Sequence, residues 1–193
     1  MGSIEDQAEV KDSSCNVKVA VRVRPANSIE LNDNSSNIIT FPRDNELKIY
    51  LNNPNNNSID RDKRFTFDQT FSPNSTQKEI YDKIVKNDVE NFLQGFNVTI
   101  LAYGQTGSGK TYTMGTEYNQ STSQTNLGIL PRVIQQIFDQ VKKDDDQYIY
   151  DLKVSFLEIY KERIKDLLIE AEPDENNAPS IRENVKGEII VEG

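Results

Sequence analysis

Residues 104–111 fit the phosphate-loop pattern G-x-x-x-x-G-K-[ST], and this feature constrains the fold more than any other in the chain. The apolar run 98–103 precedes the pattern, so the loop lies between a predicted strand and a predicted helix. Glycines let the backbone turn with its N–H groups directed at phosphate oxygens, and the next helix presents its positive dipole end to the same anion. This context predicts an α/β fold with a nucleotide site, in preference to an ordinary glycine-rich turn.

Two side chains at the end of the loop have separate predicted roles. Lys110 is expected to reach the β- and γ-phosphates, and the Thr111 hydroxyl is expected to bind a magnesium ion that bridges them. These two residues are the catalytic candidates, and the expected ligands are ATP or ADP with Mg2+. The loop residues expected to bind the nucleotide are Gly104, Gln105, Thr106, Gly107, Ser108, Gly109, Lys110 and Thr111.

The composition excludes several kinds of chemistry. The 193 residues contain no histidine, which removes Ser-His-Asp and Cys-His catalysis and most catalytic zinc sites. Phosphoryl transfer needs no imidazole, because it depends on positioning and on electrostatic stabilisation by backbone, lysine and magnesium. A single cysteine, Cys15, and the lack of any long apolar stretch indicate a globular domain in the reducing cytoplasm.

The overall charge limits the kinds of partner. The chain has 31 acidic and 22 basic residues, a net charge of −9, which disfavours non-specific attraction to nucleic acid or anionic lipid. No lysine- or arginine-rich run occurs, so neither nucleic acid nor a membrane is expected as a partner. An acidic partner would have to meet a local basic patch.

The amino-terminal residues predict a tail and then a strand. Residues 1–15 are short of large apolar side chains and are expected to be a disordered tail, with the domain covering 16–193. Valines alternate with other residues along 17–23, which predicts a strand. On this pattern alone, Arg22 and Arg24 lie on a solvated strand face.

Short β-like runs follow. Asparagine-rich stretches at 32–37 and 52–57 bracket the runs 38–41 and 47–51, which together predict a small peripheral β-lobe without chemistry of its own.

Aromatic residues and a helix come next. Phe65, Phe67 and Phe71 are predicted core anchors around a half-buried strand and turn. A capping box over Thr76–Glu79 then begins a helix with apolar residues at helical spacing, which Gly95 ends.

The carboxyl-terminal half alternates between predicted helices and strands. After a polar loop at 116–126, a helix is expected from near Pro131 to Val141, and the long alternating segment 148–160 predicts a strand. The remaining predicted elements are a short helical turn at 164–168, an acidic loop at 170–178, and a hairpin of 180–183 with 188–191.

The segment 95–114, which contains the phosphate loop, closely resembles the nucleotide-binding segment of kinesin motor domains. Other stretches resemble the family in the same order within 16–193: 21–25, 65–71, 128–138 and 154–168. The spacing is most similar to the conventional heavy-chain type. The resemblance implies a P-loop NTPase fold, a three-layer α/β sandwich with a mostly parallel or mixed central sheet. It also implies a motor that couples ATP hydrolysis to movement along microtubules.

The resemblance implies roles for residues outside the loop. Arg22, Arg24 and Pro25 would lie beside the adenine, with Tyr112 stacking on its other face, which guanidinium and aromatic groups can do physically. Five basic residues occupy positions where such motors present a basic loop to acidic tubulin: Lys161, Arg163, Lys165, Arg182 and Lys186. The alternative for these five is a scatter of solvated side chains.

Some family segments do not occur in these residues. The N-x-x-S-S-R-S-H and D-L-A-G-S-E segments, which sense the γ-phosphate, are absent, and so is any Asp-x-x-Gly. We therefore expect slow hydrolysis by this stretch alone, weak microtubule binding, and dimerisation only through regions outside it. We also expect an incomplete central sheet and a longer parent domain.

Two other functions fit parts of the pattern. One is an ATP-binding or regulatory module that holds nucleotide without turnover. The other is an unrelated P-loop nucleotide kinase, in which Asp68 or Glu158 would supply the magnesium carboxylate.

Overall fold

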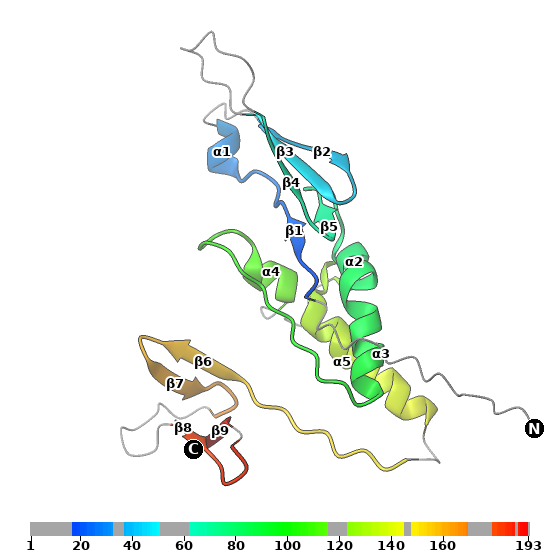
Figure 1. The fold of residues 1–193 in the computed structure, drawn as a ribbon, viewed down its shortest axis with the longest axis vertical. Coiled ribbons are helices and arrows are strands. Elements are labelled where there is room, and N and C mark those ends of the chain that lie inside the picture. The colour runs from blue at the N-terminus through cyan, green and yellow to red at the C-terminus, as the bar shows by residue number, and fades with distance from the viewer. Residues whose placement is uncertain are drawn as a thin grey trace, which may run out of the picture. The chain divides into compact units, whose positions relative to one another are not determined.

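The computed structural model describes residues 17–32, 37–50, 62–115, 123–144, 148–169, 179–187 and 189–192. It divides into two compact units, Met1–Lys143 and Asp144–Gly193, which are described one at a time (Figure 1). The predicted tail, the second asparagine-rich stretch, most of the loop 116–126 and the acidic loop 170–178 lie outside the described residues. No helix within the described ranges is long and apolar enough to span a bilayer.

The α-helices and strands of the first unit are labelled in Figure 1, and two further helical turns lie between them. In chain order they are β1 (Ala20–Arg22), α1 (Ser28–Asn32), β2 (Ile39–Arg43), β3 (Glu46–Ile49), β4 (Lys63–Thr66), β5 (Gln69–Phe71), α2 (Gln77–Ile80), a π-helical turn (Tyr81–Val85), α3 (Lys86–Leu93), α4 (Lys110–Met114), a 3-10 turn (Gln124–Asn126) and α5 (Ile129–Lys143).

A parallel pair of strands joins residues 20–22 to residues 69–71. Strand β1 pairs with β5, with Ala20 opposite Gln69 and Arg22 opposite Phe71. The bond from Val23 N–H to the Phe71 carbonyl, at 2.9 Å, continues the pairing by one residue. The predicted strand at 17–23 is therefore confirmed in position and is shorter than the alternation indicated.

The predicted β-lobe is confirmed as a three-stranded antiparallel sheet in the order β2-β3-β4. Leu47 is buried in it, and the buried carboxylate of Glu46 lies 3.4 Å from an Arg64 nitrogen and 3.7 Å from Arg43 Nε. Phe65 is 41% exposed because it lies on the edge strand β4, so its prediction as a core anchor is wrong. Phe71 is 2% exposed and confirms the same prediction.

The central helical segment begins at the predicted capping box. Thr76 Oγ1 accepts the Glu79 N–H, and a Glu79 carboxylate oxygen accepts the Thr76 N–H at 2.7 Å. Helices α2 and α3 continue one another through the π-helical turn, which the periodicity did not predict. Gly95 follows the end of α3 with φ of 98°, a conformation that glycine adopts without strain.

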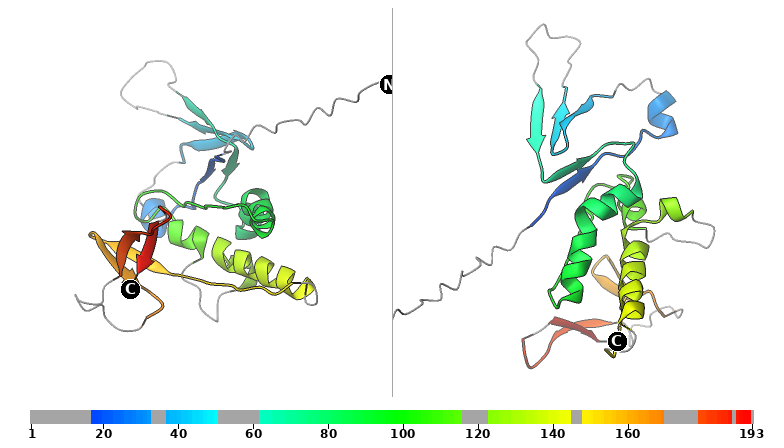
Figure 2. Two further views of the ribbon diagram at one scale, coloured as in Figure 1. Left: turned by 60° about the horizontal axis from the view of Figure 1, so that its bottom comes forward. Right: turned by 90° about the vertical axis from the view of Figure 1, so that its right-hand side faces the viewer.

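The hydrophobic core lies between this helical segment, β5 and α5. Helix α5 packs against α3 and the π-helical turn, which lie next to it in the right-hand view of Figure 2. The side chain of Gln136 on α5 bonds to the Tyr81 hydroxyl and to the Lys86 carbonyl. The buried core residues are Phe71, Ile80, Tyr81, Val85, Val89 and Ile129. Burial raises the pKa of the Tyr81 hydroxyl to about 12. Pro131 lies in the first turn of α5, as predicted.

The predicted strand before the phosphate loop is wrong for this structure, because residues 96–104 form no strand. A strand requires hydrogen bonds to a neighbour, and within the described residues no segment pairs with this one. Leu101 and Tyr103 are accordingly 83% and 95% exposed, whereas Ile100 packs against the core. The expectation of an incomplete central sheet is met.

The second unit consists of hairpins. Strands β6 (Leu157–Tyr160) and β7 (Arg163–Asp166) pair around a turn at Lys161 and Glu162, whose φ angles are 50° and 65°. The predicted strand at 148–160 is thus confined to β6. The predicted helical turn at 164–168 is wrong, because residues 163–166 pair with β6.

A second hairpin follows within the same unit. Strands β8 (Ser180–Glu183) and β9 (Ile189–Glu192) pair in antiparallel fashion, which confirms the predicted hairpin around Gly187.

Candidate nucleotide-binding site

The phosphate loop has the backbone geometry that its glycines allow. Gly107 and Gly109 have φ of 78° and 95°, in the left-handed region that side chains disfavour. A Cβ on Gly104 would lie 2.6 Å from Ser108 Oγ, so only glycine fits there without movement. Gln105 to Ser108 form a turn in which the Ser108 N–H donates to the Gln105 carbonyl at 3.2 Å.

The Lys110 ammonium lies against this turn. Its Nζ donates to the carbonyl of Gly104 at 2.8 Å and to the carbonyl of Gln105 at 2.9 Å. Lys110 is also the first residue of α4, so the ammonium and the start of the helix face the same short loop. The Gly104 and Gln105 carbonyls thus hold the cation of the motif within the loop that is predicted to bind phosphate.

Thr111 and Tyr112 follow on the first turn of α4. Thr111 is exposed, and Tyr112 is 53% exposed, so both side chains are accessible to a ligand. The Gly109 carbonyl accepts the Thr113 N–H at 2.9 Å, which connects the loop to the helix. Among the described residues no three acidic, histidine or cysteine side chains lie close enough together to form a metal site.

Arg22 is packed inside the first unit and does not lie on a solvated strand face. Its guanidinium carbon is 5.1 Å from the centre of the Tyr112 ring. Its NH1 donates to Gln77 Oε1 and to Thr113 Oγ1, both at 2.8 Å. Burial lowers the pKa of this guanidinium, and the neighbouring Tyr112 opposes that shift. Arg22 therefore supports one face of the Tyr112 ring.

Gln77 contacts the candidate site, and the sequence analysis missed it. Its side chain is buried, with the residue 3% exposed, and its Nε2 donates to the Tyr112 carbonyl at 2.6 Å. A longer bond of 3.4 Å reaches the Asn126 carbonyl. Gln77 thus holds both the Arg22 guanidinium and the backbone of α4. Its place after the capping residue Thr76 was visible in the sequence, but nothing local indicated these distant partners.

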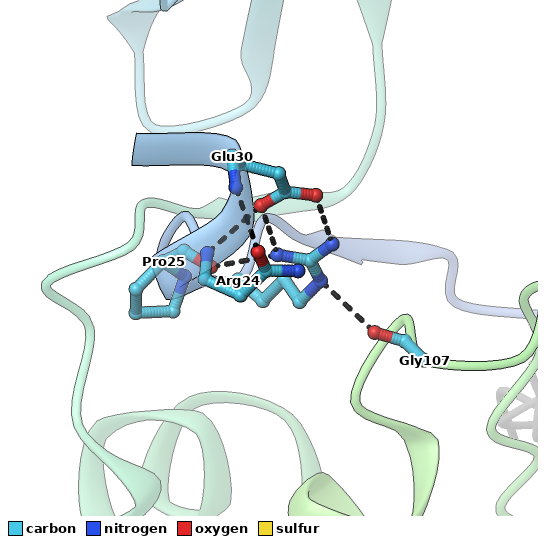
Figure 3. Close-up of polar contacts among 5 residues, drawn as sticks. Arg24, Pro25, Glu30 and Gly107 are labelled. Carbon is cyan, nitrogen blue, oxygen red and sulfur yellow. Dashed lines mark hydrogen bonds and ion pairs between the residues drawn. The ribbon is translucent and has the colours of Figure 1, made fainter. Parts of the chain in front are cut away.

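Arg24 connects the end of β1 to the phosphate loop (Figure 3). Its Nε donates to the Gly107 carbonyl at 2.9 Å, and NH1 donates to the Pro25 carbonyl at 2.9 Å. The two terminal nitrogens form a bidentate pair with the Glu30 carboxylate at 2.7 and 2.6 Å. The pairing with Glu30 raises the pKa of Arg24.

Glu30 is itself held by a capping box that the sequence analysis also missed. The Asn27 side-chain oxygen accepts the Glu30 N–H at 2.9 Å, and a Glu30 carboxylate oxygen accepts the Asn27 N–H at 2.8 Å. The hydrogen bonds from Arg24, and then the one from Asn27, lower the pKa of Glu30 to about 2. The pattern Asn-x-x-Glu was the available signal, but no apolar run follows it as one follows Thr76.

The basic residues assigned to a partner lie on the hairpins of the second unit. Lys161 is in the turn between β6 and β7, and Arg163 and Lys165 lie on β7 at alternate positions, which face the same side of a strand. Arg182 is on β8, and Lys186 is in the loop that follows it. The structure therefore groups three of the five on one hairpin and two on the other.

The carboxylates named for a nucleotide kinase lie in or next to paired strands. Asp68 Oδ2 accepts the Val19 N–H at 2.7 Å, next to the β1–β5 pair. Glu158 lies on β6 directly opposite Lys165, in the second unit. The arrangement of Asp68 supports a structural role next to the β1–β5 pair.

Comparison with known proteins identifies the family. The family model described as kinesin motor domain matches residues 22–193. The chain belongs to the kinesin motor domain family. This kinesin chain is 41% identical over 182 residues to Kinesin-related protein 8 of Dictyostelium discoideum, covering 94% of the chain and 9% of that protein. It is 39% identical over 197 residues to Kinesin-like protein KIN-5C of Arabidopsis thaliana, covering 95% of the chain and 19% of that protein.

A solved kinesin structure shows the fold. The structure of a fast kinesin, reported with implications for its ATPase mechanism and its interactions with microtubules, matches with a TM-score of 0.76 at 34% identity. The match covers 92% of this kinesin chain and 46% of the other. The P-loop NTPase fold with mixed sheets is therefore confirmed, and the chain spans about half of the fold that the neighbour contains.

The subtype of this kinesin stays a prediction. A kinesin heavy chain, from Syncephalastrum racemosum, is 36% identical over 183 residues and covers 94% of the chain and 18% of that protein. The kinesin-related and kinesin-like relatives are similar at comparable identity. The chain spans less than a fifth of the length of each of these three relatives.

Proposed function

We propose that this chain is the ATP-binding part of a microtubule motor, and that its parent protein couples ATP hydrolysis to movement along microtubules. One observation supports this most strongly. In a chain of the kinesin motor domain family, the phosphate loop ends with the Lys110 ammonium held by two loop carbonyls at the start of α4.

Lys110 would bind the β- and γ-phosphates of the nucleotide. When phosphate enters, its oxygens replace the Gly104 and Gln105 carbonyls as partners of the ammonium, which exchanges neutral acceptors for charged ones. Backbone N–H groups at the start of α4 would add donors to the same anion.

Thr111 would hold magnesium. Its hydroxyl is exposed in the first turn of α4, directly after the phosphate-binding lysine, and a hydroxyl oxygen is a suitable ligand for this hard cation. When bound, the ion neutralises phosphate charge.

The adenine would stack on the accessible face of Tyr112, near Arg24 and Pro25. Because Arg22 packs over the ring and is held by Gln77, its role in this arrangement is to support Tyr112. This differs in detail from a direct contact between Arg22 and the base, which was the original prediction.

Turnover and filament binding are assigned to the parent protein. The described residues supply nucleotide binding, and the sequence holds no Asp-x-x-Gly to sense the γ-phosphate, so we expect the 193 residues alone to hydrolyse ATP slowly. The basic residues of the two hairpins would contact the acidic surface of tubulin, which places the protein on the cytoplasmic microtubule cytoskeleton.

Calorimetry tests the proposal directly. We expect the wild-type chain to bind ADP and ATP in a magnesium-dependent manner. Lys110→Ala should weaken binding at least about tenfold, because it removes the main phosphate cation. Lys83→Ala, on the central helical segment, is the control for loss of one positive charge. Absence of nucleotide binding by folded wild-type protein would reject the function, and retained affinity in Lys110→Ala would reject the loop assignment.

The same preparation tests the motor assignment. ATP turnover is measured with and without microtubules, for this chain and for a version extended along its parent sequence. Stimulation by microtubules in the extended version alone is expected. Nucleotide binding without stimulation in either version would favour the non-catalytic ATP-binding module.

A further inference from the structure

The carbonyl of Gly107 is the point where the phosphate loop is tied to the rest of the first unit through Arg24. Gly107 lies in the turn 105–108, and its φ of 78° is in the left-handed region, which glycine adopts without strain. The Arg24 Nε bond of 2.9 Å reaches this carbonyl across 83 residues of sequence. The same peptide group carries the Ser108 N–H, which donates to the Gln105 carbonyl at 3.2 Å. Arg24 therefore adds a second restraint on the orientation of this peptide group, from outside the loop.

The Glu30 carboxylate sets the direction in which Arg24 donates. A guanidinium is planar, so a bidentate pair on its two terminal nitrogens also fixes the direction of the Nε–H. Glu30 makes this pair at 2.7 and 2.6 Å. In Figure 3 the Arg24 guanidinium lies between the Glu30 carboxylate and the Gly107 carbonyl and bonds to both, so Glu30 acts on Gly107 through Arg24.

The Asn27 capping box fixes Glu30 in turn. Two reciprocal bonds of 2.9 and 2.8 Å join Asn27 and Glu30 at the start of α1. The carboxylate oxygen that accepts the Asn27 N–H also accepts from Arg24 NH1, so a single oxygen belongs to both contacts. The result is a chain of contacts from α1 to the loop: Asn27, Glu30, Arg24 and the Gly107 carbonyl.

We propose that Glu30 is a positioning residue for nucleotide binding, which orients the phosphate loop through Arg24. The inference rests on the proposed nucleotide function of the same loop. It extends that function to a carboxylate on a separate short helix, which neither the motif nor charge would select. By charge alone, an acidic residue near a phosphate site would repel the ligand, so its removal would strengthen binding. The proposal predicts the opposite, that removal of the Glu30 charge weakens nucleotide binding.

Two effects of removing the Glu30 charge oppose each other. A full charge about 10 Å away through water changes the affinity for an anion by about twofold, which would favour binding when the charge is lost. Loss of a bidentate, charge-assisted pair releases Arg24, and such pairs are strong enough to outweigh that gain even when they are half-exposed. The predicted net result of Glu30→Gln is about tenfold weaker binding of Mg-ADP.

Titration calorimetry of the 193-residue chain with Mg-ADP provides the test. Glu30→Gln is compared with Glu79→Gln, which removes the carboxylate of the other capping box, at the start of α2, without a bond to Arg24. We expect Glu30→Gln to weaken binding about tenfold and Glu79→Gln to change it less than about twofold. Equal losses in the two variants would mean that helix capping alone is responsible, and would overturn the proposal.

A double-mutant comparison tests whether the effect passes through Arg24. In an Arg24→Gln background, Glu30→Gln should cause no further loss of Mg-ADP affinity. A further tenfold loss when Glu30→Gln is added to Arg24→Gln would overturn the proposal. Unchanged or tighter Mg-ADP binding by the single variant Glu30→Gln would also overturn it. If the Glu30→Gln protein does not fold, Arg24→Lys is used in its place. Lysine keeps the positive charge next to Glu30 but cannot make the bidentate contact, so Arg24→Lys should also weaken Mg-ADP binding, and unchanged affinity would overturn the proposal.

The outcome is distinct from that of the proposed function. If the wild-type chain binds no Mg-ADP, the nucleotide function fails. If the wild-type binds it and the Glu30→Gln variant binds it equally well, only the positioning role fails.

Discussion

Arg22 and Arg24 are two residues apart, yet their guanidinium groups do different things. Arg22 is partly buried beside Tyr112, and that burial lowers its pKa, whereas the pairing of Arg24 with Glu30 raises the pKa of Arg24. Arg22 holds the Tyr112 ring and the Thr113 hydroxyl of α4, while Arg24 holds the phosphate loop at Gly107. The two arginines therefore support different parts of the candidate site, Arg22 the aromatic ring and Arg24 the phosphate loop.

Tyr112 should contribute to binding of the base and little to binding of phosphate. We predict that Tyr112→Ala weakens Mg-ADP binding about tenfold, in line with the energy of one base–aromatic stack, and leaves the affinity for tripolyphosphate within about twofold. Tyr112→Phe is the matched control, because it keeps the ring, and should bind Mg-ADP nearly as well as wild type. Calorimetry with both ligands measures this, and equal losses for the two ligands would remove the stacking role.

The pKa of Glu30 gives the contact with Arg24 a defined pH dependence. In the folded chain this pKa is about 2, below the value of about 4.3 for an unfolded glutamate. A depressed folded pKa contributes stability above the unfolded value, and that stability is lost as the pH falls toward 2. We predict that the difference in unfolding free energy between wild type and Glu30→Gln is constant from pH 8 to about 5 and shrinks below that. Urea unfolding at several pH values measures it, and a difference that persists undiminished at pH 3 contradicts the prediction.

At the scale of elements, α4 is short but is held by residues from distant segments. Gln77 on α2 bonds to its Tyr112 carbonyl, and Arg22 on β1 bonds to its Thr113 hydroxyl. A five-residue helix has little stability of its own, so these tertiary bonds keep Lys110 and Thr111 in place. The phosphate loop is therefore fixed at its end by α2 and β1, and at Gly107 by Arg24.

Two glycines form a close backbone contact just after α4. A Cβ on Gly115 would lie 2.8 Å from the Gly128 Cα, so the segment before α5 passes directly against the end of α4. Arg132 on α5 secures the same approach, since its Nε donates to the Leu127 carbonyl at 2.9 Å. The contact couples the position of α4 to that of α5.

Gly128→Ala should disturb this contact through crowding alone. Gly128 is not in the left-handed region, so we expect the added methyl to cost about 1–3 kcal/mol of stability by displacing the Gly115 backbone, and also to weaken Mg-ADP binding. Gly95→Ala is the control, because Gly95 has open space but φ of 98°, so it should lose stability without losing affinity. Chemical unfolding and calorimetry measure both quantities, and unchanged affinity in Gly128→Ala would show that α4 does not move with α5.

The sequence predicted local features well and distant partners poorly. The sequence was sufficient for the Thr76–Glu79 capping box, for Gly95 and for the glycines of the phosphate loop, because each depends on residues close together in the chain. The structure shows all three features. Gln77 was missed because its partners lie 55 and 35 residues away, and no periodicity encodes them. The strand at 148–160 was predicted too long because alternation marks a capacity for pairing, and only residues with a partner across the turn at Lys161 form a strand.

At the scale of the whole molecule, the two units carry different parts of the proposed function. The first unit, Met1–Lys143, contains the phosphate loop and the arginines, aromatic ring and capping boxes around it. The second, Asp144–Gly193, presents basic side chains on hairpins although the chain carries a net charge of −9. Because the Debye length is about 8 Å in the cell, a local basic surface can attract an acidic partner at short range despite the total charge.

Binding to microtubules should therefore depend on where positive charge lies and not on its total. We predict that Lys161→Glu with Arg163→Glu, at the tip of the β6–β7 hairpin, weakens co-sedimentation with microtubules about tenfold at low salt and reduces its salt dependence. The pair Lys142→Glu with Lys143→Glu, at the exposed end of α5, changes the net charge equally and is the control. Mg-ADP affinity should stay within about twofold of wild type in both, because neither pair belongs to the phosphate loop or to the residues bonded to it. Equal weakening in the two double variants would show that net charge governs the attraction and would remove the hairpin from the proposed interface.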